Sequence, residues 1–466
     1  MVRASRLLVA SSLVLLVPAC GGSSGGGGGE GEDVASQAEI DSLRQELAFA
    51  GIVPLAEPPE VSEELFELGR ALFFDKILSG SQDVSCATCH LPQFATGDGR
   101  TLSDGVRGIG FGPNRGGGEI IPRNSPALFA LHLKQQIFWD GRLSVHANGP
   151  GMTFGLPEAV PVDAQMVATF TPGLEVLGIQ AMLPPVSREE MRGEPGENPL
   201  GDLEDGYNSP GGRPEGTLEV WDQLMERVML TPGYLELLQA AYPTTLLATF
   251  GFEHAANAIA AFETRAFART DSAFERFVRG DDRALTGRQV RGAHAFFQAG
   301  CAACHSGSLL SDEDFHNTGL PQLGPGVIGT SFGAVPGSDV GREVASQVFA
   351  DRFKFRTPSL LNVALTGPWG HAGQFERLRD MVAHYRDPFL SHYTYDIQSN
   401  VSDPALVTTL VPNSAEVLAT LDSRLRRVND FDVDAVVEFL ESLTADSARD
   451  LSELVPDSVP SGLPVF

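Results

Sequence analysis

The chain has 466 residues, enough for two or three domains of ordinary size. It is 42% hydrophobic, and 60 acidic against 33 basic side chains give a formal charge of -27. This balance excludes the basic footprint of a nucleic-acid-binding protein and argues against direct electrostatic docking on anionic lipid. The 51 Gly and 31 Pro predict long and numerous loops.

The N-terminus resembles an export signal. A short positive region precedes the apolar residues 7–17, a stretch too short to anchor a protein across a bilayer. Small residues then lead to Cys20, as in bacterial lipoproteins that carry a lipid on the first mature cysteine. Residues 1–19 are therefore predicted to be a lipoprotein signal peptide; the alternative is an ordinary signal peptide with an incidental cysteine. The Gly/Ser-rich residues 20–36 are predicted to be a tether that holds the protein in the periplasm or cell envelope.

The four other cysteines form two C-x-x-C-H sequences, at residues 86–90 and 301–305. This spacing is typical of covalent c-type haem attachment, because two thiols bind one haem and the adjacent histidine ligates its iron. A redox dithiol does not need the histidine, and a zinc site needs two more ligands close by. The sequence therefore predicts two covalent c-type haems, held by Cys86, Cys89 and His90 and by Cys301, Cys304 and His305.

The spacing of apolar residues predicts a mainly α-helical fold. Helical periodicity occurs over residues 61–72, 221–228, 259–267, 290–297, 378–385 and 433–443. No segment shows sustained period-two alternation. Two cytochrome c-like haem domains with long loops are expected, at residues 37–245 and 246–450, with a tail at 451–466. The Gly-rich residues 105–118 are expected to form a loop near the first haem, because no strand-turn-helix context surrounds them.

Three further motifs make the chain resemble the bacterial di-haem cytochrome c peroxidase superfamily, which includes the methylamine-utilisation di-haem enzyme. The motifs are Arg-Asn-Ser-Pro at 123–126, Phe-Trp-Asp-Gly-Arg at 138–142 and Phe-Arg-Thr-Pro-Ser-Leu-Leu-Asn-Val at 355–363, in the family's order. The resemblance runs from about residue 61 to the end. It implies that the N-terminal haem domain is peroxidatic and that the C-terminal one transfers electrons.

The resemblance also implies a peroxide pocket beside the first haem. Cleaving the O–O bond needs a group that moves a proton between the two oxygens. In the family this is a glutamate just before a methionine, a position held here by Glu190. A glutamine ten residues earlier and a proline six earlier line the same pocket, and they are Gln180 and Pro184. Phe138 is expected to form an aromatic wall, and Glu189 is the alternative proton carrier.

The first haem is expected to keep one open face. Many family members close it with a second histidine about sixteen residues after the C-x-x-C-H sequence, but Val106 stands at that offset here. No His or Met occurs from residue 91 to 131. The alternatives are that His132 or His146 binds the iron, although His132 lies in an expected helix, which favours a structural role.

Between the haems, the resemblance implies an electron-relaying indole, which is Trp139. Arg123 and Arg142 either pair with haem carboxylates as bidentate donors or form interdomain salt bridges. The family also binds calcium between its domains. The implied protein ligands are the side chain of Asn124 and the backbone carbonyls of Thr366 and Pro368, an all-oxygen set that suits calcium.

The second haem departs from a typical peroxidase. Where that family has a methionine as sixth ligand, the alignment places Tyr385, and the methylamine-utilisation enzyme also has tyrosine there. Phenolate favours oxidised iron, whereas methionine raises the reduction potential. Met381 lies one helical turn earlier and is the alternative ligand, with His384 a third candidate.

The leading interpretation is an exported di-haem peroxidase that reduces hydrogen peroxide with electrons from a cytochrome c or a copper protein. One alternative is a di-haem oxidase that uses peroxide equivalents to oxidise a protein or organic substrate. Another is a non-enzymatic electron carrier. The acidic chain predicts a basic partner, steered electrostatically. No nucleic acid is expected, the membrane is contacted only through the N-terminal lipid, and a homodimer is left open.

Overall fold

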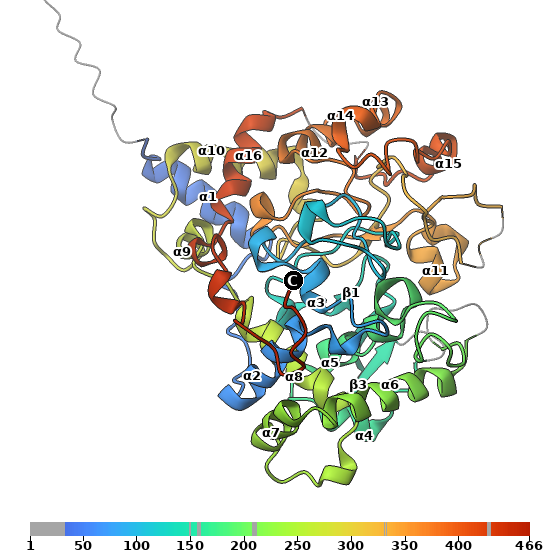
Figure 1. Ribbon diagram of the computed structural model, residues 1–466. Coiled ribbons are helices and arrows are strands. Elements are labelled where there is room, and N and C mark those ends of the chain that lie inside the picture. The colour runs from blue at the N-terminus through green and yellow to red at the C-terminus, as the bar shows by residue number, and fades with distance from the viewer. Residues whose placement is uncertain are drawn as a thin grey trace, which may run out of the picture. The chain divides into compact units, whose positions relative to one another are not determined.

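The computed structural model describes residues 33–148, 151–155, 160–206, 212–329, 331, 333–425 and 430–466. The predicted signal peptide and most of the predicted tether lie outside them. Val34–Phe466 form one compact unit, in which short helices are joined by long loops (Figure 1). The mainly helical class is confirmed. Among the described residues, no helix combines the length and the apolar character needed to cross a bilayer.

The helices are numbered in chain order. They are α1 (Gln37–Phe49), α2 (Glu63–Phe74), α3 (Cys86–Cys89), α4 (Ala164–Val167), α5 (Glu175–Ala181), α6 (Pro214–Met229), α7 (Pro232–Ala241), α8 (Phe252–Ala266), α9 (Ala273–Val278), α10 (Gly287–Ala299), α11 (Arg342–Ser346), α12 (Leu378–His384), α13 (Pro388–Tyr393), α14 (Ile397–Asn400), α15 (Ser414–Ala419) and α16 (Val433–Ser442). The six segments predicted from periodicity correspond to α2, α6, α8, α10, α12 and α16.

Two small antiparallel sheets complete the fold. One has the order β1-β2-β3, formed by β1 (Gln136–Ile137), β2 (Leu143–Asn148) and β3 (Gly151–Gly155). The other pairs β4 (Phe315–His316) with β5 (Phe355–Arg356). Neither sheet was predicted, because the strands are short. Residues 105–118 form a loop with one 3-10 turn, as expected.

The first core is built on the contact between α2 and α8. A Cβ atom at Gly69 would lie 1.8 Å from the carbonyl oxygen of Ala258, so only glycine allows the two helices to approach this closely. Aromatic side chains fill the contact, with the rings of Phe73 and Phe262 centred 5.0 Å apart. Helices α5, α6 and α7 contribute to the same core.

The second core is built on α10 and α16. The side chains of Val290, Phe296 and Phe439 are almost fully buried there, and α1, α9 and α12 pack around them. A capping box starts α10, in which Thr286 and Gln289 each accept the other's backbone N–H.

Each core also takes in a segment from the far end of the chain. Helix α1 packs in the second core although it precedes the first haem motif, and residues 445–459 pack in the first core. The first core extends through α8 to Phe267, beyond residue 245. The predicted domain limits themselves stay a prediction.

Candidate active site

The first C-x-x-C-H sequence forms α3 and the residue that ends it. The ring Nδ1 of His90 lies 2.9 Å from the carbonyl oxygen of Thr96, to which it donates a hydrogen bond. Burial lowers the pKa of His90 to about 4, so the ring is neutral. A neutral imidazole with its Nδ1–H engaged presents Nε2 as a ligand, and this is the form that binds iron.

The second C-x-x-C-H sequence repeats this arrangement. The Nδ1 of His305 lies 2.9 Å from the carbonyl oxygen of Leu310, and burial lowers the pKa of the ring. Cys301 and Cys304 line the same cavity as His305. The residues at both sites therefore fit a covalently attached haem with a proximal histidine.

Two candidate sixth ligands reach the cavity that contains His305. Tyr385 and Met381 both line it. Burial and the nearby Cys304 and Cys301 raise the pKa of the Tyr385 phenol, which places this side chain close to the second attachment motif. His384 is engaged elsewhere, because its ring nitrogens lie 2.9 Å from Ser391 Oγ and 2.9 Å from the Thr318 carbonyl.

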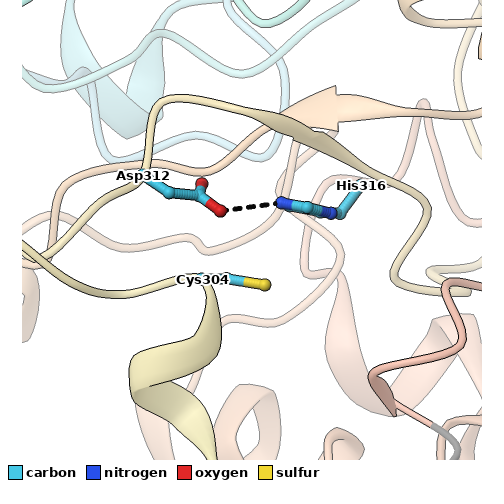
Figure 2. Close-up of side chains that lie close together, drawn as sticks. All are labelled: Cys304, Asp312 and His316. Atoms are coloured by element: carbon cyan, nitrogen blue, oxygen red, sulfur yellow. Dashed lines mark hydrogen bonds and ion pairs between the residues drawn. The ribbon is translucent and has the colours of Figure 1, made fainter. Parts of the chain in front are cut away.

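A charged cluster lies beside Cys304 at the edge of this cavity. Figure 2 shows Asp312 and His316 joined by a hydrogen bond, with the Cys304 sulfur next to them. The Nε2 of His316 lies 3.0 Å from Asp312, and its Nδ1 lies 2.7 Å from Asp422. Burial alone lowers the pKa of His316, but hydrogen bonds to Asp312 and Cys304 and the contact with Asp422 raise it to about 10. Because Cys304 belongs to a haem-attachment motif, we do not assign a separate metal site here.

Glu190 lies on a single π-helical turn, Arg188–Arg192. Burial is the main cause that raises its pKa to about 7, and the neighbouring Glu189 raises it further, while Arg142 lowers it. A carboxyl group with a pKa near neutrality can both accept and donate a proton. The Ser187 hydroxyl donates to the Glu189 carboxylate at 3.3 Å, and it also lowers the pKa of Glu190.

Gln180, Pro184 and Phe138 were predicted to line the pocket of Glu190, and this set stays a prediction. Gln180, on α5, and Pro184, at the start of the following 3-10 turn, are both partly buried, and that turn packs against the π-helical turn. The guanidinium of Arg142 lies 4.1 Å from the ring centre of Phe138 and also acts on Glu190. Phe138 has a φ of 68°, a strained conformation for a bulky residue, and its ring stacks under Arg142.

The loop that carries Val106 packs against the π-helical turn. The backbone N–H of Val106 donates to the carbonyl of Glu189 at 3.1 Å, and its side chain is fully buried. The side chain at the position considered for a second histidine is therefore apolar and held in place. His132 lies in a 3-10 turn rather than the expected helix and bonds the Ala56 carbonyl at 3.0 Å, which supports a structural role. The side chain of His146 lies outside the described part of the structure.

Trp139 lines the cavity that contains His305, called the second cavity because it holds the second attachment motif, and it is fixed by hydrogen bonds on two sides. Its indole N–H donates to the Asn124 carbonyl at 2.8 Å, and its own carbonyl accepts the backbone N–H of Arg356 at 2.8 Å. Nearby, Arg123 binds Asp339 through two nitrogens, at 2.6 and 2.8 Å.

Both arginines of the sequence motifs form ion pairs within the protein. Arg123 also pairs with Asp140 at 2.7 Å, and Arg142 pairs with the same carboxylate at 3.3 Å. Despite burial, these two arginines lower the pKa of Asp140 to about 2. The structure thus shows the salt-bridge alternative for Arg123.

The three residues implied in calcium binding also line the cavity that contains His305: Asn124, Thr366 and Pro368. The side-chain nitrogen of Asn124 donates to the carbonyls of Arg100 and Thr101, at 3.1 and 3.2 Å. These contacts engage the amide nitrogen and leave the side-chain oxygen as the candidate cation ligand. This arrangement suits an oxygen ligand to a cation.

Comparisons with known proteins agree with this geometry. A family model described as di-haem cytochrome c peroxidase matches residues 63–283. The chain is 28% identical over 354 residues to the methylamine utilization protein MauG of Methylorubrum extorquens, covering 75% of this chain and 76% of that protein. It is 30% identical over 324 residues to cytochrome c551 peroxidase of Pseudomonas aeruginosa, covering 69% of this chain and 72% of that protein. Among solved structures, a MauG-like protein associated with microbial copper homeostasis has the same fold, with a TM-score of 0.57 and 24% identity over 86% of this chain and 97% of that one.

Proposed function

This chain belongs to the di-haem cytochrome c peroxidase family, and from that premise we propose that it reduces hydrogen peroxide to water with electrons from a small redox protein. Membership makes the protein an oxidoreductase and implies two c-type haems. The reaction consumes two electrons and two protons and yields two water molecules for each peroxide. The residues must therefore bind peroxide, deliver protons and admit electrons.

The observation that carries the proposal is the position of Glu190, whose carboxyl lies close enough to the first attachment motif to raise the pKa of Cys89. The pKa of Glu190 itself is raised to about 7, chiefly by burial. When bound, the haem at this motif supplies the iron that takes peroxide and delivers electrons to it. Glu190 takes the proton from one peroxide oxygen and returns it to the other, so that water can leave. Arg142 lies close enough to stabilise the ionised carboxylate.

An open face at the first site follows from the residues around Val106. The loop backbone is hydrogen-bonded to Glu189, and the Val106 side chain offers no ligand atom. We therefore expect the oxidised protein to accept peroxide at this site without first displacing a histidine. Gln180, Pro184 and Phe138 are proposed to shape the pocket in which peroxide meets Glu190.

The two haems would supply the redox-active iron, and Trp139 is proposed to relay electrons from the site of His305 to the site of His90. The indole lines the second cavity and is held by Asn124 and Arg356, so its position is fixed. A calcium ion on Asn124, Thr366 and Pro368 would stiffen the same region. The acidic chain favours a basic donor, and the proposed location is the periplasm or cell envelope, through a lipid on Cys20.

A second candidate function is oxidation of a protein or organic substrate. The observation that favours it is Tyr385, which lines the second cavity where a methionine ligand would raise the potential. Under this alternative, the electrons that reduce peroxide would come from the substrate, which is oxidised, and not from a small redox protein.

The two functions are separated by one experiment. The purified holoenzyme, fully oxidised or reduced by one electron, is mixed with peroxide, and peroxide loss is followed with and without a reduced basic cytochrome c. Catalytic loss that depends on the cytochrome supports the peroxidase. A fast reaction of the oxidised protein that the cytochrome does not sustain favours the oxidase.

A further inference from the structure

Two buried cations line the cavity of the second haem without a carboxylate partner. Lys134 is 9% exposed and Arg356 is 4% exposed, and both line the cavity that contains His305. Within the described ranges, no carboxylate oxygen lies within 4.0 Å of either cation. The Lys134 ammonium donates to the Ala127 carbonyl at 3.3 Å. The Arg356 guanidinium donates to the carbonyls of Phe138 and Thr357, at 3.1 and 3.2 Å.

Carbonyl contacts alone do not compensate two buried charges. An unpaired buried cation is costly, and such groups are normally neutralised or paired. Burial lowers the pKa of Lys134 to about 7 and also lowers that of Arg356. The other cations of this region are compensated: Arg123 binds Asp339 and Asp140, and Arg424 contacts Asp312 at 3.4 Å. The cavity therefore holds two buried cationic groups, Lys134 and Arg356, for which the protein supplies no carboxylate partner.

We propose that Lys134 and Arg356 bind the two propionate carboxylates of the haem attached at Cys301 and Cys304. This inference rests on the two-haem cofactor content, not on the reaction catalysed. A haem carries two carboxylates, which matches the two unpaired cations in number and sign. The planar guanidinium suits a bidentate contact, and the flexible ammonium supplies a point charge.

Lys134 and Arg356 also lie close to Trp139, the proposed electron relay. Lys134 lies a few residues before Trp139 in the chain, and the backbone N–H of Arg356 binds the Trp139 carbonyl. Carboxylates held by both side chains would fix the haem edge relative to the indole. Lys134 and Arg356 are therefore positioning residues for electron transfer.

Two acidic groups could compete for Lys134. Glu313 and Glu263 both raise its pKa, and Arg356 lowers it. The Glu313 carboxylate is already engaged by the backbone N–H groups of residues 135 and 136, at 3.0 and 3.2 Å. Glu263 is buried, one of its carboxylate oxygens has no hydrogen-bond partner, and burial raises its pKa to about 8. Glu263 is therefore largely neutral at pH 7, so it compensates Lys134 poorly.

The test measures the reduction potential of the second haem in the holoenzyme, by spectroelectrochemical titration over a range of pH. Lys134→Met should keep both haems attached and lower this potential, because an uncompensated carboxylate favours oxidised iron. The potential should also become pH-dependent between about pH 5 and 8, since losing the cation raises the carboxylate pKa. Lys134→Arg should restore the wild-type behaviour.

Two matched variants complete the test. Arg424→Gln removes a cation that lines the same cavity but already has a carboxylate partner, so the pH dependence should stay as in wild type. Glu263→Gln should also leave it unchanged. A wild-type potential and slope in Lys134→Met would overturn the proposal, as would a Glu263→Gln protein that reproduces the slope of Lys134→Met. A haem-to-protein ratio near one would instead overturn the two-haem premise.

Discussion

Replacing Glu190 by glutamine removes the group that we expect to move the peroxide proton. General acid–base groups contribute about 100- to 10,000-fold to turnover, which corresponds to roughly 3–5 kcal/mol of barrier. Glu190→Gln should therefore lose at least about 100-fold in kcat while both haems stay attached. The amide is nearly isosteric, so the pocket keeps its shape.

The same substitution should not destabilise the fold. A pKa of about 7, against the ordinary value of 4.5 for a glutamate, means that ionising this carboxyl in its buried surroundings opposes folding. The folded state holds its proton more tightly, so stability is highest below the unfolded pKa and falls as pH rises towards about 7. Glutamine removes this cost, and Glu190→Gln should be more stable than wild type at pH 8, by up to about 3 kcal/mol. Chemical unfolding at pH 5 and pH 8 measures the difference.

Steady-state peroxide reduction across pH completes the assay. Wild-type turnover should fall as pH drops through about 7, where Glu190 becomes protonated and can no longer accept the peroxide proton. Glu189→Gln is the matched control: it should keep turnover near wild type and move the midpoint to lower pH, because Glu189 raises the pKa of Glu190. If Glu189→Gln loses turnover and Glu190→Gln does not, the proton carrier is Glu189. If neither loses turnover, the pocket assignment is wrong.

Three further outcomes are expected. Arg142→Gln should move the pH midpoint of turnover upward, since Arg142 lowers the pKa of Glu190. An unchanged midpoint in the same assay would show that Arg142 does not act on the group that limits turnover. Asp339→Asn leaves Arg123 short of its bidentate partner and should lower the free energy of unfolding by about 3 kcal/mol, as measured by denaturant titration. Asp434→Asn, at an exposed pair with Arg379, should cost much less in the same titration, because solvent screens that pair. Cys301→Ala combined with Cys304→Ala should halve the covalent haem content measured by absorbance and mass spectrometry, and a retained second haem would contradict the attachment motif.

The six predicted helices share one property that allowed their prediction from the sequence. Each has an apolar stripe at helical spacing, and the structure buries that stripe, as at Leu68 and Leu72 of α2. Helix α1 escaped prediction because only three of its side chains, Ile40, Leu43 and Leu47, are buried. Its partner in the second core lies more than two hundred residues away in the chain, as the contact of His294 with Glu46 shows.

The haem-attachment residues were predictable because their chemistry fixes their spacing. Glu190 was predictable only through resemblance, since no local pattern distinguishes it from Glu189. What the structure adds is the surroundings of Glu190, whose pKa is raised chiefly by burial and whose carboxyl acts on Cys89 of the first attachment motif. Burial of this kind comes from segments that are distant in sequence.

Lys134 and His316 show the limit of sequence reasoning more clearly. Neither belongs to a motif, and a lysine or histidine in a loop-rich chain is usually exposed. Their chemistry arises only when β4 and the segment before Trp139 fold against the second cavity. The three-stranded sheet was missed for a related reason, because period-two alternation over one six-residue strand is too short to stand out.

The sixth ligand of the second haem decides between the two proposed functions. Met381 lies on α12 and Tyr385 is the residue that ends this helix, four residues later, so both line the cavity. The raised pKa of the phenol means that Tyr385 ionises only where a cation such as ferric iron lowers the pKa again. A bound phenolate would stabilise oxidised iron, so Tyr385→Phe should raise the reduction potential of the second haem and Met381→Leu should leave it unchanged. Spectroelectrochemical titration of the two variants measures this. The reverse pattern would make Met381 the ligand, and the second haem could then store an electron as the conventional peroxidase cycle requires.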